Sequence, residues 1–288
     1  MRTRLVDLLS IEDVGGDTFR GPISASERAR LFGGLVAGQA LVAASRTVPE
    51  DRPVHSFHSY FLRPGDPKVP VEFSVTRERD GRSFTTRHIL AKQHDESIFS
   101  MTASFQVEEK GFEHQEAVLD APPPEASPGL DEWLERGERT EALIAWLEDY
   151  RERHPIELRF PQEPNPLSAR HGPLPSRQGV WMRSRDPLPD DRLTHVCSLT
   201  YASDLFLLSS GLRPHGLAFM AETVVGASLD HAVWFHAEFR ADEWLYYDMH
   251  SPWAGNSRAL NFGQIFAEDG RLIASAVQEG LMRPNSRA

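Results

Sequence analysis

The sequence contains a single cysteine, Cys197, among its 288 residues. An intrachain disulfide is therefore excluded, and so is structural zinc held by several cysteines. A chain with one cysteine is typical of a reducing compartment, so we expect a cytoplasmic location.

Long hydrophobic runs and a basic character are also missing. No apolar run approaches the roughly 18 residues that a membrane-spanning helix needs. The net charge is −11, and such an acidic chain is poorly suited to nucleic acid. We therefore expect no membrane span and no nucleic-acid partner. Arg82, Arg87, Arg183 and Arg185 could hold a small phosphorylated ligand, although such charges are more often solvated surface.

The familiar cofactor and metal motifs are absent too. The chain has no Gly-x-Gly-x-x-Gly, no Walker loop, no His-Glu-x-x-His and no Cys-x-x-Cys. A nucleophile elbow requires Gly-x-Ser-x-Gly, and the stretch from Gly226 through Ser228 ends in Asp230 where the second glycine belongs. We expect no cofactor and no metal.

Ser228, Asp230 and His231 contain the residue types of a hydrolytic triad within four positions. In a strand, Ser228 and Asp230 face one side and His231 faces the other. The imidazole could not then bridge serine to aspartate, so the sequence disfavours this triad.

What the sequence does contain is an internal repeat. Phe57-His58-Ser59-Tyr60-Phe61 resembles Phe235-His236-Ala237-Glu238-Phe239, and each copy is followed by a Gly-x-Ser triplet, at Gly81 and at Gly255. Each copy then closes on a glutamine after an apolar stretch, at Gln106 and at Gln278. Three markers in the same order indicate an ancient duplication.

The two copies share one order of expected elements, a buried helix followed by antiparallel strands. We expect helices over 31–47, 131–153 and 191–209, and strands over 54–62, 69–76, 83–90, 98–107, 156–160, 179–185, 217–227, 232–239, 243–251, 256–267 and 271–279. The Pro-rich stretch 121–129 cannot be regular structure. We therefore predict two units, 1–107 and 155–288, joined by a linker with a surface helix over 108–154.

Asp204 is the most suggestive single residue, because it lies in the apolar stretch Tyr201-Ala202-Ser203-Asp204-Leu205-Phe206 of the expected helix. A buried carboxylate there would need hydrogen-bond partners. Taken alone, Gln278 could equally be a structural amide, and Ser228 a strand or turn hydroxyl.

Four stretches resemble acyl-CoA thioesterase II, the TesB-like double-hotdog family. They are His55 to Gly65, Tyr201 to Asp204, Leu229 to His231 with Trp234 to His236, and Val277 to Gly280. The resemblance covers about residues 5–284. It implies an α+β fold of two hotdog units, each a curved antiparallel sheet around one long helix. It also implies hydrolysis of fatty acyl-CoA, of medium or long chain, by a homo-oligomer (dimer or tetramer).

The family's active site maps here onto Asp204, Ser228 and Gln278. An aspartate can accept the proton of an attacking water, while a hydroxyl and an amide can fix its remaining hydrogen bonds. A backbone N–H near a helix start would stabilise the oxyanion. Apolar candidates for the acyl tunnel, which could equally be core, are Phe57, Phe61, Phe206, Leu207, Leu208, Trp234 and Phe235.

Two rival functions remain open at this level. A hotdog-type enoyl-CoA hydratase would need an aspartate and a histidine facing one substrate, for which Asp230 with His231 or His236 is the local candidate. A non-catalytic acyl-CoA-binding protein could keep the fold without the chemistry.

Overall fold

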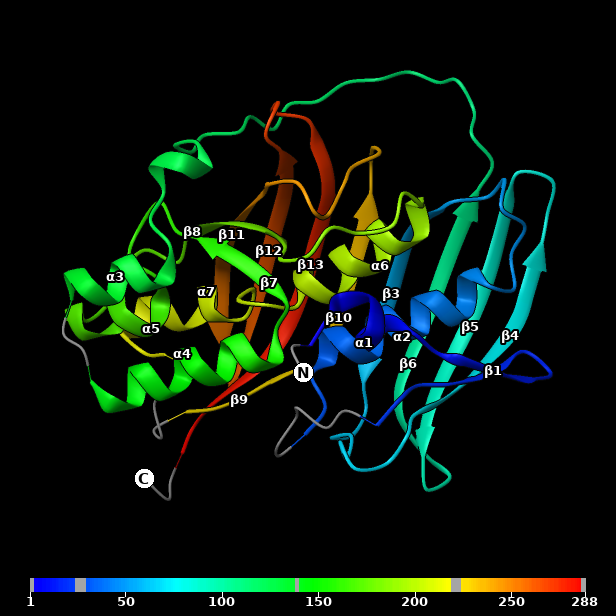
Figure 1. Ribbon diagram of the computed structural model, residues 1–288, viewed down its shortest axis with the longest axis horizontal. Coiled ribbons are helices and arrows are strands. Elements are labelled where there is room, and N and C mark those ends of the chain that lie inside the picture. Colours follow the sequence, from blue (N-terminus) through cyan, green and yellow to red (C-terminus); the bar gives the residue numbers. More distant parts are fainter. Residues whose placement is uncertain (1–2, 24–29, 138–139, 219–223, 286–288) are drawn as a thin grey trace.

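The computed structural model describes residues 3–23, 30–137, 140–218 and 224–285 (Figure 1). The helices are α1 (Leu5–Leu9), α2 (Gly33–Ser45), α3 (Leu130–Arg136), α4 (Glu141–Arg153), α5 (Asn165–Ser168), α6 (Arg192–Ser203) and α7 (Ser209–Leu212), with short 3-10 turns η1 (Pro124–Ala126), η2 (Ala169–His171) and η3 (Arg213–His215). The strands are β1 (Glu12–Gly15), β2 (Thr18–Arg20), β3 (Val54–Phe61), β4 (Glu72–Asp80), β5 (Phe84–Gln93), β6 (Glu96–Gln106), β7 (Ile156–Arg159), β8 (Gln178–Ser184), β9 (Val224–Ser228), β10 (Asp230–Phe235), β11 (Leu245–Gly255), β12 (Arg258–Ala267) and β13 (Leu272–Pro284).

Within the described residues the strands form one sheet with a mirrored order. Its path runs β1-β2-β4-β5-β6-β3-β10-β13-β12-β11-β8-β7, and β9 pairs with β13 beside it. The centre is the antiparallel pair β3·β10, in which Phe57 lies opposite Val233. On either side of this pair, β6, β5 and β4 correspond to β13, β12 and β11. The repeat is therefore visible as two sheet halves joined edge to edge.

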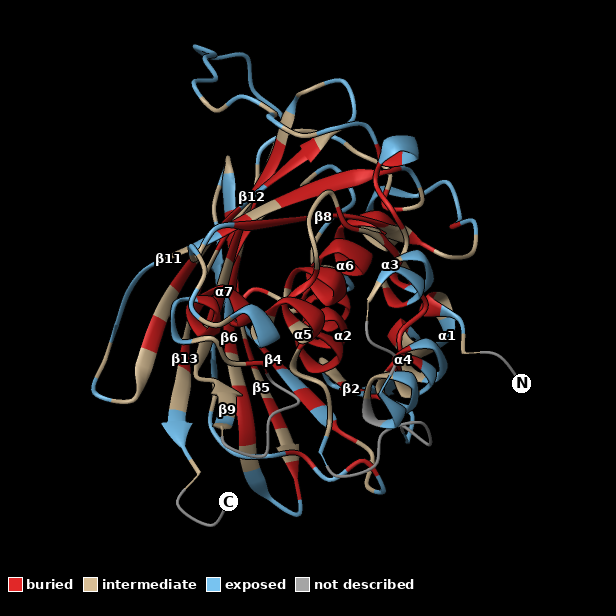
Figure 2. Cartoon of the chain, turned by 90° about the vertical axis from the view of Figure 1, so that its left-hand side faces the viewer, coloured by how far each residue is buried: buried red, intermediate tan, exposed pale blue. Residues whose placement is uncertain are grey.

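Helices α2 and α6 lie on the inner face of this sheet and are almost wholly buried (Figure 2). The near-continuous apolar composition of α2 explains its position, because only an enclosed helix can bury every face. α6 also buries polar side chains, among them His195, Thr200 and Ser203. Glycine is costly inside a helix but allows another backbone to pass closely, and α6 supplies that backbone to α2. A Cβ on Gly34 would lie 2.3 Å from the Tyr201 carbonyl oxygen, and one on Gly38 would lie 3.3 Å from that of Cys197.

The strand predictions hold to within a few residues where alternation is clear. In β5 the buried positions alternate strictly along the strand, as expected for a sheet with one covered face. The expected strand 217–227 falls partly on residues 219–223, which lie outside the described part, and β9 begins at Val224. The segment between β6 and α3 runs along the upper edge of the molecule (Figure 1). The prediction that 121–129 lacks regular structure was wrong in part, because the short 3-10 turn η1 lies within it, where Pro124 fits the first position of the turn.

Two helix predictions were wrong in their extent. The helix expected over 131–153 is divided into α3 and α4, because Gly137 ends the first and the Thr140 hydroxyl caps the second by accepting from the Leu143 N–H at 3.2 Å. The helix expected over 191–209 ends at Ser203. Phe206 has a φ of +64°, which a continuous right-handed helix does not allow.

Candidate active site

Asp204 is the residue that follows α6 directly and forms its C-terminal cap. The expectation that it lies within the helix was wrong by one residue, because α6 ends at Ser203. From the helix end its carboxylate reaches the neighbouring strands β9 and β13. Asp204 is partly exposed and lines a cavity.

The structure brings the three expected site residues together. The Ser228 hydroxyl donates to Asp204 Oδ1 at 3.2 Å, and Gln278 Nε2 donates to the same oxygen at 2.5 Å. The pairing of β9 with β13 explains the convergence, since Ser228 lies opposite Gly280 and Gln278 lies two residues earlier on the same face. Ser228 lines the cavity, whereas Gln278 is fully buried and holds the carboxylate from behind.

A fourth contact comes from the other half of the molecule. The backbone N–H of Gly34, in the first turn of α2, donates a hydrogen bond to the Asp204 carboxylate. A Cβ on Gly33 would lie 2.7 Å from Asp204 Oδ2, so the helix start approaches this oxygen closely. The first N–H groups of a helix have no partner within it and carry a partial positive charge. These two glycines were not identified as site residues from the sequence.

Burial raises the pKa of Asp204 from its ordinary 3.8 to about 6. The hydrogen bonds from Gln278, Ser228 and Gly34, and the charge of Arg30, oppose this shift without cancelling it. Removal of water from around a carboxylate disfavours its charged form, while donors favour that form. The result is a carboxylate that is ionised at neutral pH and still basic enough to accept a proton.

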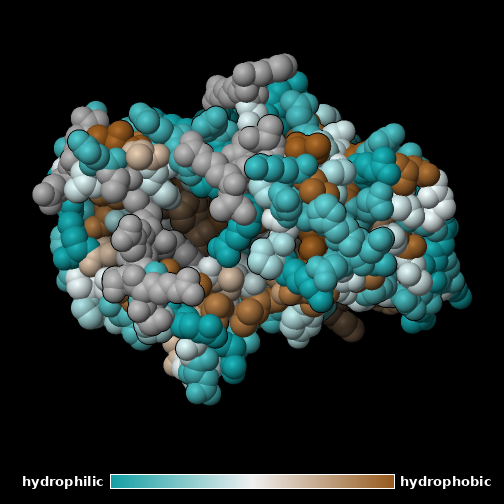
Figure 3. Space-filling model, turned by 90° about the horizontal axis from the view of Figure 1, so that it is seen from below, coloured by the Kyte–Doolittle hydropathy of each residue, from teal (hydrophilic) through white to brown (hydrophobic). Residues whose placement is uncertain are grey.

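The cavity at Asp204 has a volume of about 380 Å³, within the range of small-molecule sites. Figure 3 looks onto this side of the molecule and shows a hollow with hydrophobic residues in its depth. The cavity is lined by Arg30, Leu31, Phe32, Gly33, Val36, Phe61, Leu62, Arg63, Pro64, Gly65, Ile98, Phe99, Arg153, Asp204, Phe206, Leu208, Gly226, Ala227, Ser228 and Leu229.

Three of the seven apolar tunnel candidates line this cavity: Phe61, Phe206 and Leu208. The other four do not. Phe57 and Leu207 are fully buried core residues. The sequence reasoning also missed three arginines of the lining, because charge alone does not reveal which surface residues surround a cavity.

The competing constellations are not assembled. Asp230 accepts a hydrogen bond from the Glu279 N–H at 2.6 Å, His231 Nε2 is 2.8 Å from the Ser203 hydroxyl, and His236 Nε2 is 2.9 Å from the Ser275 hydroxyl. The Ser228–Asp230–His231 triad that the sequence disfavours is therefore not formed, nor is an Asp230–histidine pair among these contacts.

Three of the four arginines suggested for a phosphorylated ligand have structural contacts instead, and the fourth, Arg82, is exposed. Arg87 is fully buried and paired with Asp80, while Arg183 is paired with Glu157 and lies over the Trp244 ring. Arg185 donates to the carbonyl oxygens of Arg151 and His154.

Among the described residues, no helix is long and apolar enough to cross a membrane. In the same part of the chain, no group of three or more His, Cys, Asp or Glu side chains is placed to hold a metal ion.

Two family models of acyl-CoA thioesterases match the two halves of the chain. A family model described as acyl-CoA thioesterase matches residues 149–281, and one described as acyl-CoA thioesterase N-terminal domain matches residues 22–106. Human acyl-coenzyme A thioesterase 8 is 40% identical over 283 residues, covering 96% of this chain and 88% of the human protein.

Solved structures agree with this assignment. The crystal structure of acyl-CoA thioesterase II TesB2 from Mycobacterium marinum is 44% identical, with a TM-score of 0.78 and coverage of 99% of this chain and 98% of that one. A hot dog fold protein from Alicyclobacillus acidocaldarius is 20% identical, with a TM-score of 0.76 over 97% of each chain. The chain belongs to the acyl-CoA thioesterase II (TesB-like) family and has the double-hotdog α+β fold. It is an enzyme that hydrolyses acyl-CoA thioesters.

Proposed function

We propose that this thioesterase activates a water molecule with Asp204, assisted by Ser228 and Gln278. The observation that carries the proposal is that the two carboxylate oxygens of Asp204 have different neighbours. Both side-chain donors converge on Oδ1. Oδ2 lies beside Gly33 at the cavity, where a water could donate to it.

In the proposed step, the water oxygen attacks the thioester carbonyl carbon while its proton passes to Asp204. The tetrahedral intermediate then collapses, the carbon–sulfur bond breaks, and Asp204 returns the proton to the leaving sulfur. A thiol with a pKa near 8.5 is a good leaving group, so delivery of the water is the step that needs help. The products are a free fatty acid and CoA, and no covalent acyl-enzyme is needed.

We assign the oxyanion donor to the start of α2. Gly33 is the first helical residue and lines the cavity, so its N–H is one of those without a partner inside the helix. Such groups suit the developing charge on a carbonyl oxygen. The Gly34 N–H is engaged with Asp204 and would hold the base in place.

The substrate proposals rest on the cavity lining. Phe61, Phe206, Leu208 and their apolar neighbours suit a medium- or long-chain acyl group. Arg30, Arg63 and Arg153 line the same cavity and could attract the phosphates of CoA. Rates across acyl-CoAs of increasing length would test the first point.

We also propose the domain limits, the location and the oligomeric state of the enzyme. The units are residues 1–107 and 155–288, with 108–154 as linker, and the enzyme works in the cytoplasm as a homodimer or homotetramer. Tyr60, 62% exposed on the central strand β3, supports an interface there, because aromatic residues are enriched in subunit contacts. Sedimentation analysis would test the assembly.

The test of the site is thiol-release kinetics on single variants. Asp204→Asn, Ser228→Ala and Gln278→Ala should each lower turnover by on the order of 10²–10⁴ with the fold intact. Asp230→Asn is the matched control, because this carboxylate accepts from the backbone and does not contact Asp204. A purified Asp204→Asn enzyme with near wild-type rates would rule the assignment out.

A further inference from the structure

A second cavity lies at the opposite end of the central helix pair. Helices α2 and α6 run antiparallel, since Gly34 approaches Tyr201 while Gly38 approaches Cys197. The start of α2 therefore meets the end of α6 at Asp204. The end of α2 meets the start of α6 at a cavity of about 460 Å³, which Ser45 and Asp191 both line.

This second cavity is the counterpart of the catalytic one within the repeat. The sheet order is mirrored about the β3·β10 pair, and each half contributes one of the two helices. Each cavity thus lies where one helix begins and the other ends. Part of the wall of the second cavity is apolar and is formed by Val48, Pro53, Val54, Phe105, Leu193 and Val196.

The groups that would activate water are missing from the counterpart. Arg46 caps the end of α2 as Asp204 caps the end of α6. Its guanidinium donates to the Ile11 carbonyl oxygen at 2.8 Å and lies over the Phe19 ring, away from the cavity. Gln106, which corresponds to Gln278 in the repeat, donates to Glu109. A ligand in this cavity would meet no equivalent of the Asp204–Gln278 pair.

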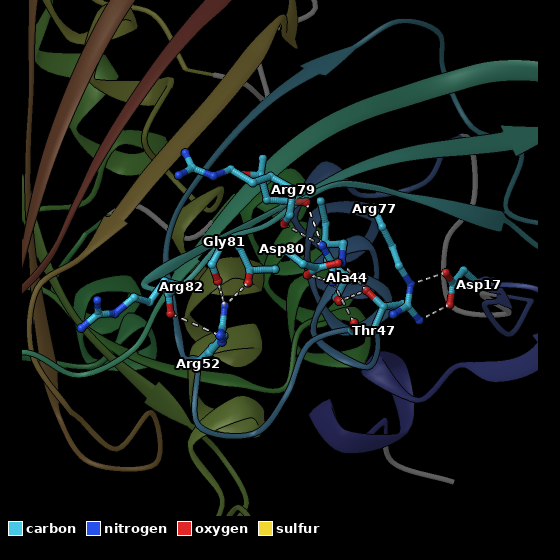
Figure 4. Close-up of polar contacts among 12 residues, drawn as sticks. Asp17, Ala44, Thr47, Arg52, Arg77, Arg79, Asp80, Gly81 and Arg82 are labelled. Carbon is cyan, nitrogen blue, oxygen red and sulfur yellow. Dashed lines mark hydrogen bonds and ion pairs between the residues drawn. The ribbon is translucent and has the colours of Figure 1, made fainter.

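The walls of the second cavity are held by hydrogen bonds from arginine side chains. Arg52, which lines it, donates to the Gly81 carbonyl oxygen at 2.6 Å and to the Thr85 hydroxyl at 2.8 Å (Figure 4). Arg87 Nη2 donates to the Thr47 carbonyl oxygen at 3.1 Å, which ties the segment after α2 to β5. These hydrogen bonds fix the position of the cavity wall.

The two cavities differ in the charge of their lining residues. Three arginines and one aspartate line the catalytic cavity, whereas Arg52 and Arg192 are balanced by Glu50 and Asp191 at the second. Arg192 is also paired with Glu108 and Glu238. A CoA group with several phosphates gains little from such a balanced surface, but a chain with one small anionic head requires only one cation.

We propose that the second cavity is a non-catalytic binding site for a free fatty acid, with the alkyl chain among the apolar residues and the carboxylate at Arg52 or Arg192. Only the choice of a fatty acid as the ligand rests on the proposed function, because a fatty acid is the product of the first site. The second site would hold this ligand without hydrolysing a thioester.

Equilibrium dialysis of radiolabelled dodecanoate against the full-length protein tests the proposal. The wild type should bind two equivalents, and Leu193→Trp, which fills the second cavity, should bind one. Val48→Trp, on the opposite wall, should also bind one. Both variants should keep kcat/KM within about twofold of the wild type, which verifies their fold. Leu208→Trp, which fills the catalytic cavity, should also bind one equivalent.

Dodecanoyl-CoA provides the comparison arm. The Asp204→Asn protein should bind one equivalent of it, and Leu193→Trp in that background should still bind one. Two equivalents of dodecanoate bound by an active Leu193→Trp enzyme would overturn the proposal. So would a failure of the Asp204→Asn, Leu193→Trp double variant to bind dodecanoyl-CoA. Should Asp204 prove dispensable for hydrolysis, the dodecanoate measurement would still stand, so the two failures can be told apart.

Discussion

The N–H of Gly34 donates a hydrogen bond to the carboxylate of Asp204, although the two residues lie 170 positions apart (204 − 34) in different halves of the repeat. The candidate base is thus held by a helix start from one half, and by Ser228 and Gln278 from the other. Neither half contains the complete arrangement.

The close approach of the two helices predicts a severe effect of Gly34→Ala. A Cβ there would lie 2.3 Å from the Tyr201 carbonyl oxygen, so α2 must move away from α6. We expect a loss of about 1–3 kcal/mol in the free energy of unfolding, as for other overpacked sites, and at least tenfold lower turnover. Urea denaturation and thiol-release assays measure both. Gly111→Ala is the control, because a Cβ there meets no atom within 4 Å, and equal behaviour of the two variants would contradict the prediction.

The raised pKa of Asp204, about 6, predicts the pH dependence of the reaction. A general base must be ionised, so kcat/KM should fall tenfold per pH unit below about pH 6 and level off above it. Arg30 lowers this pKa through its charge, so Arg30→Gln should shift the midpoint to higher pH. A flat profile between pH 5 and 8 would be incompatible with Asp204 as the base.

The same shift predicts a pH-dependent gain in stability for Asp204→Asn. The pKa of the wild-type carboxyl is higher in the folded state than its ordinary 3.8, so the folded state holds the proton more tightly. The stabilisation of the folded state by this proton is complete below about pH 3.8 and is lost as the pH rises through about 6. Above that, burial of the charge costs roughly 3 kcal/mol, at about 1.4 kcal/mol per pKa unit.

Asp204→Asn should accordingly unfold at higher denaturant concentration than the wild type at pH 8, with the difference shrinking toward pH 4. Urea midpoints at the two pH values give the comparison. A variant that is less stable at pH 8 would mean that the lost hydrogen bonds outweigh the desolvation of the charge.

The cavity lining predicts a change of substrate length for Val36→Phe. Val36 is a buried residue of α2 that lines the cavity, so a larger ring there would occupy space for the acyl chain. We expect KM to rise for long acyl-CoAs and to stay nearly constant for short ones, which serve as the internal control. A uniform change across all lengths would indicate a general disturbance of the site.

Much of the fold is determined by the sequence itself. Alternation of apolar and polar residues sets which face of each strand is buried, and an all-round apolar helix must be enclosed. These are local patterns, so β5 and α2 were placed to within a few residues. Local patterns failed where single residues end a helix, at Gly137 and at Phe206, because a left-handed or extended residue leaves little trace in periodicity.

Asp204, Ser228 and Gln278 could be named from the sequence because they recur in the motifs of a known family, and Cys197 alone excluded disulfides. Only the tertiary structure decided that Gly33 and Gly34 approach the same carboxylate, that Arg46 takes the matching place at the other end of the helix pair, and that a cavity lies at each end. The physical reason is that these relationships join segments from different halves of the chain. The antiparallel packing of α2 against α6 sets them, and no spacing along the sequence encodes it.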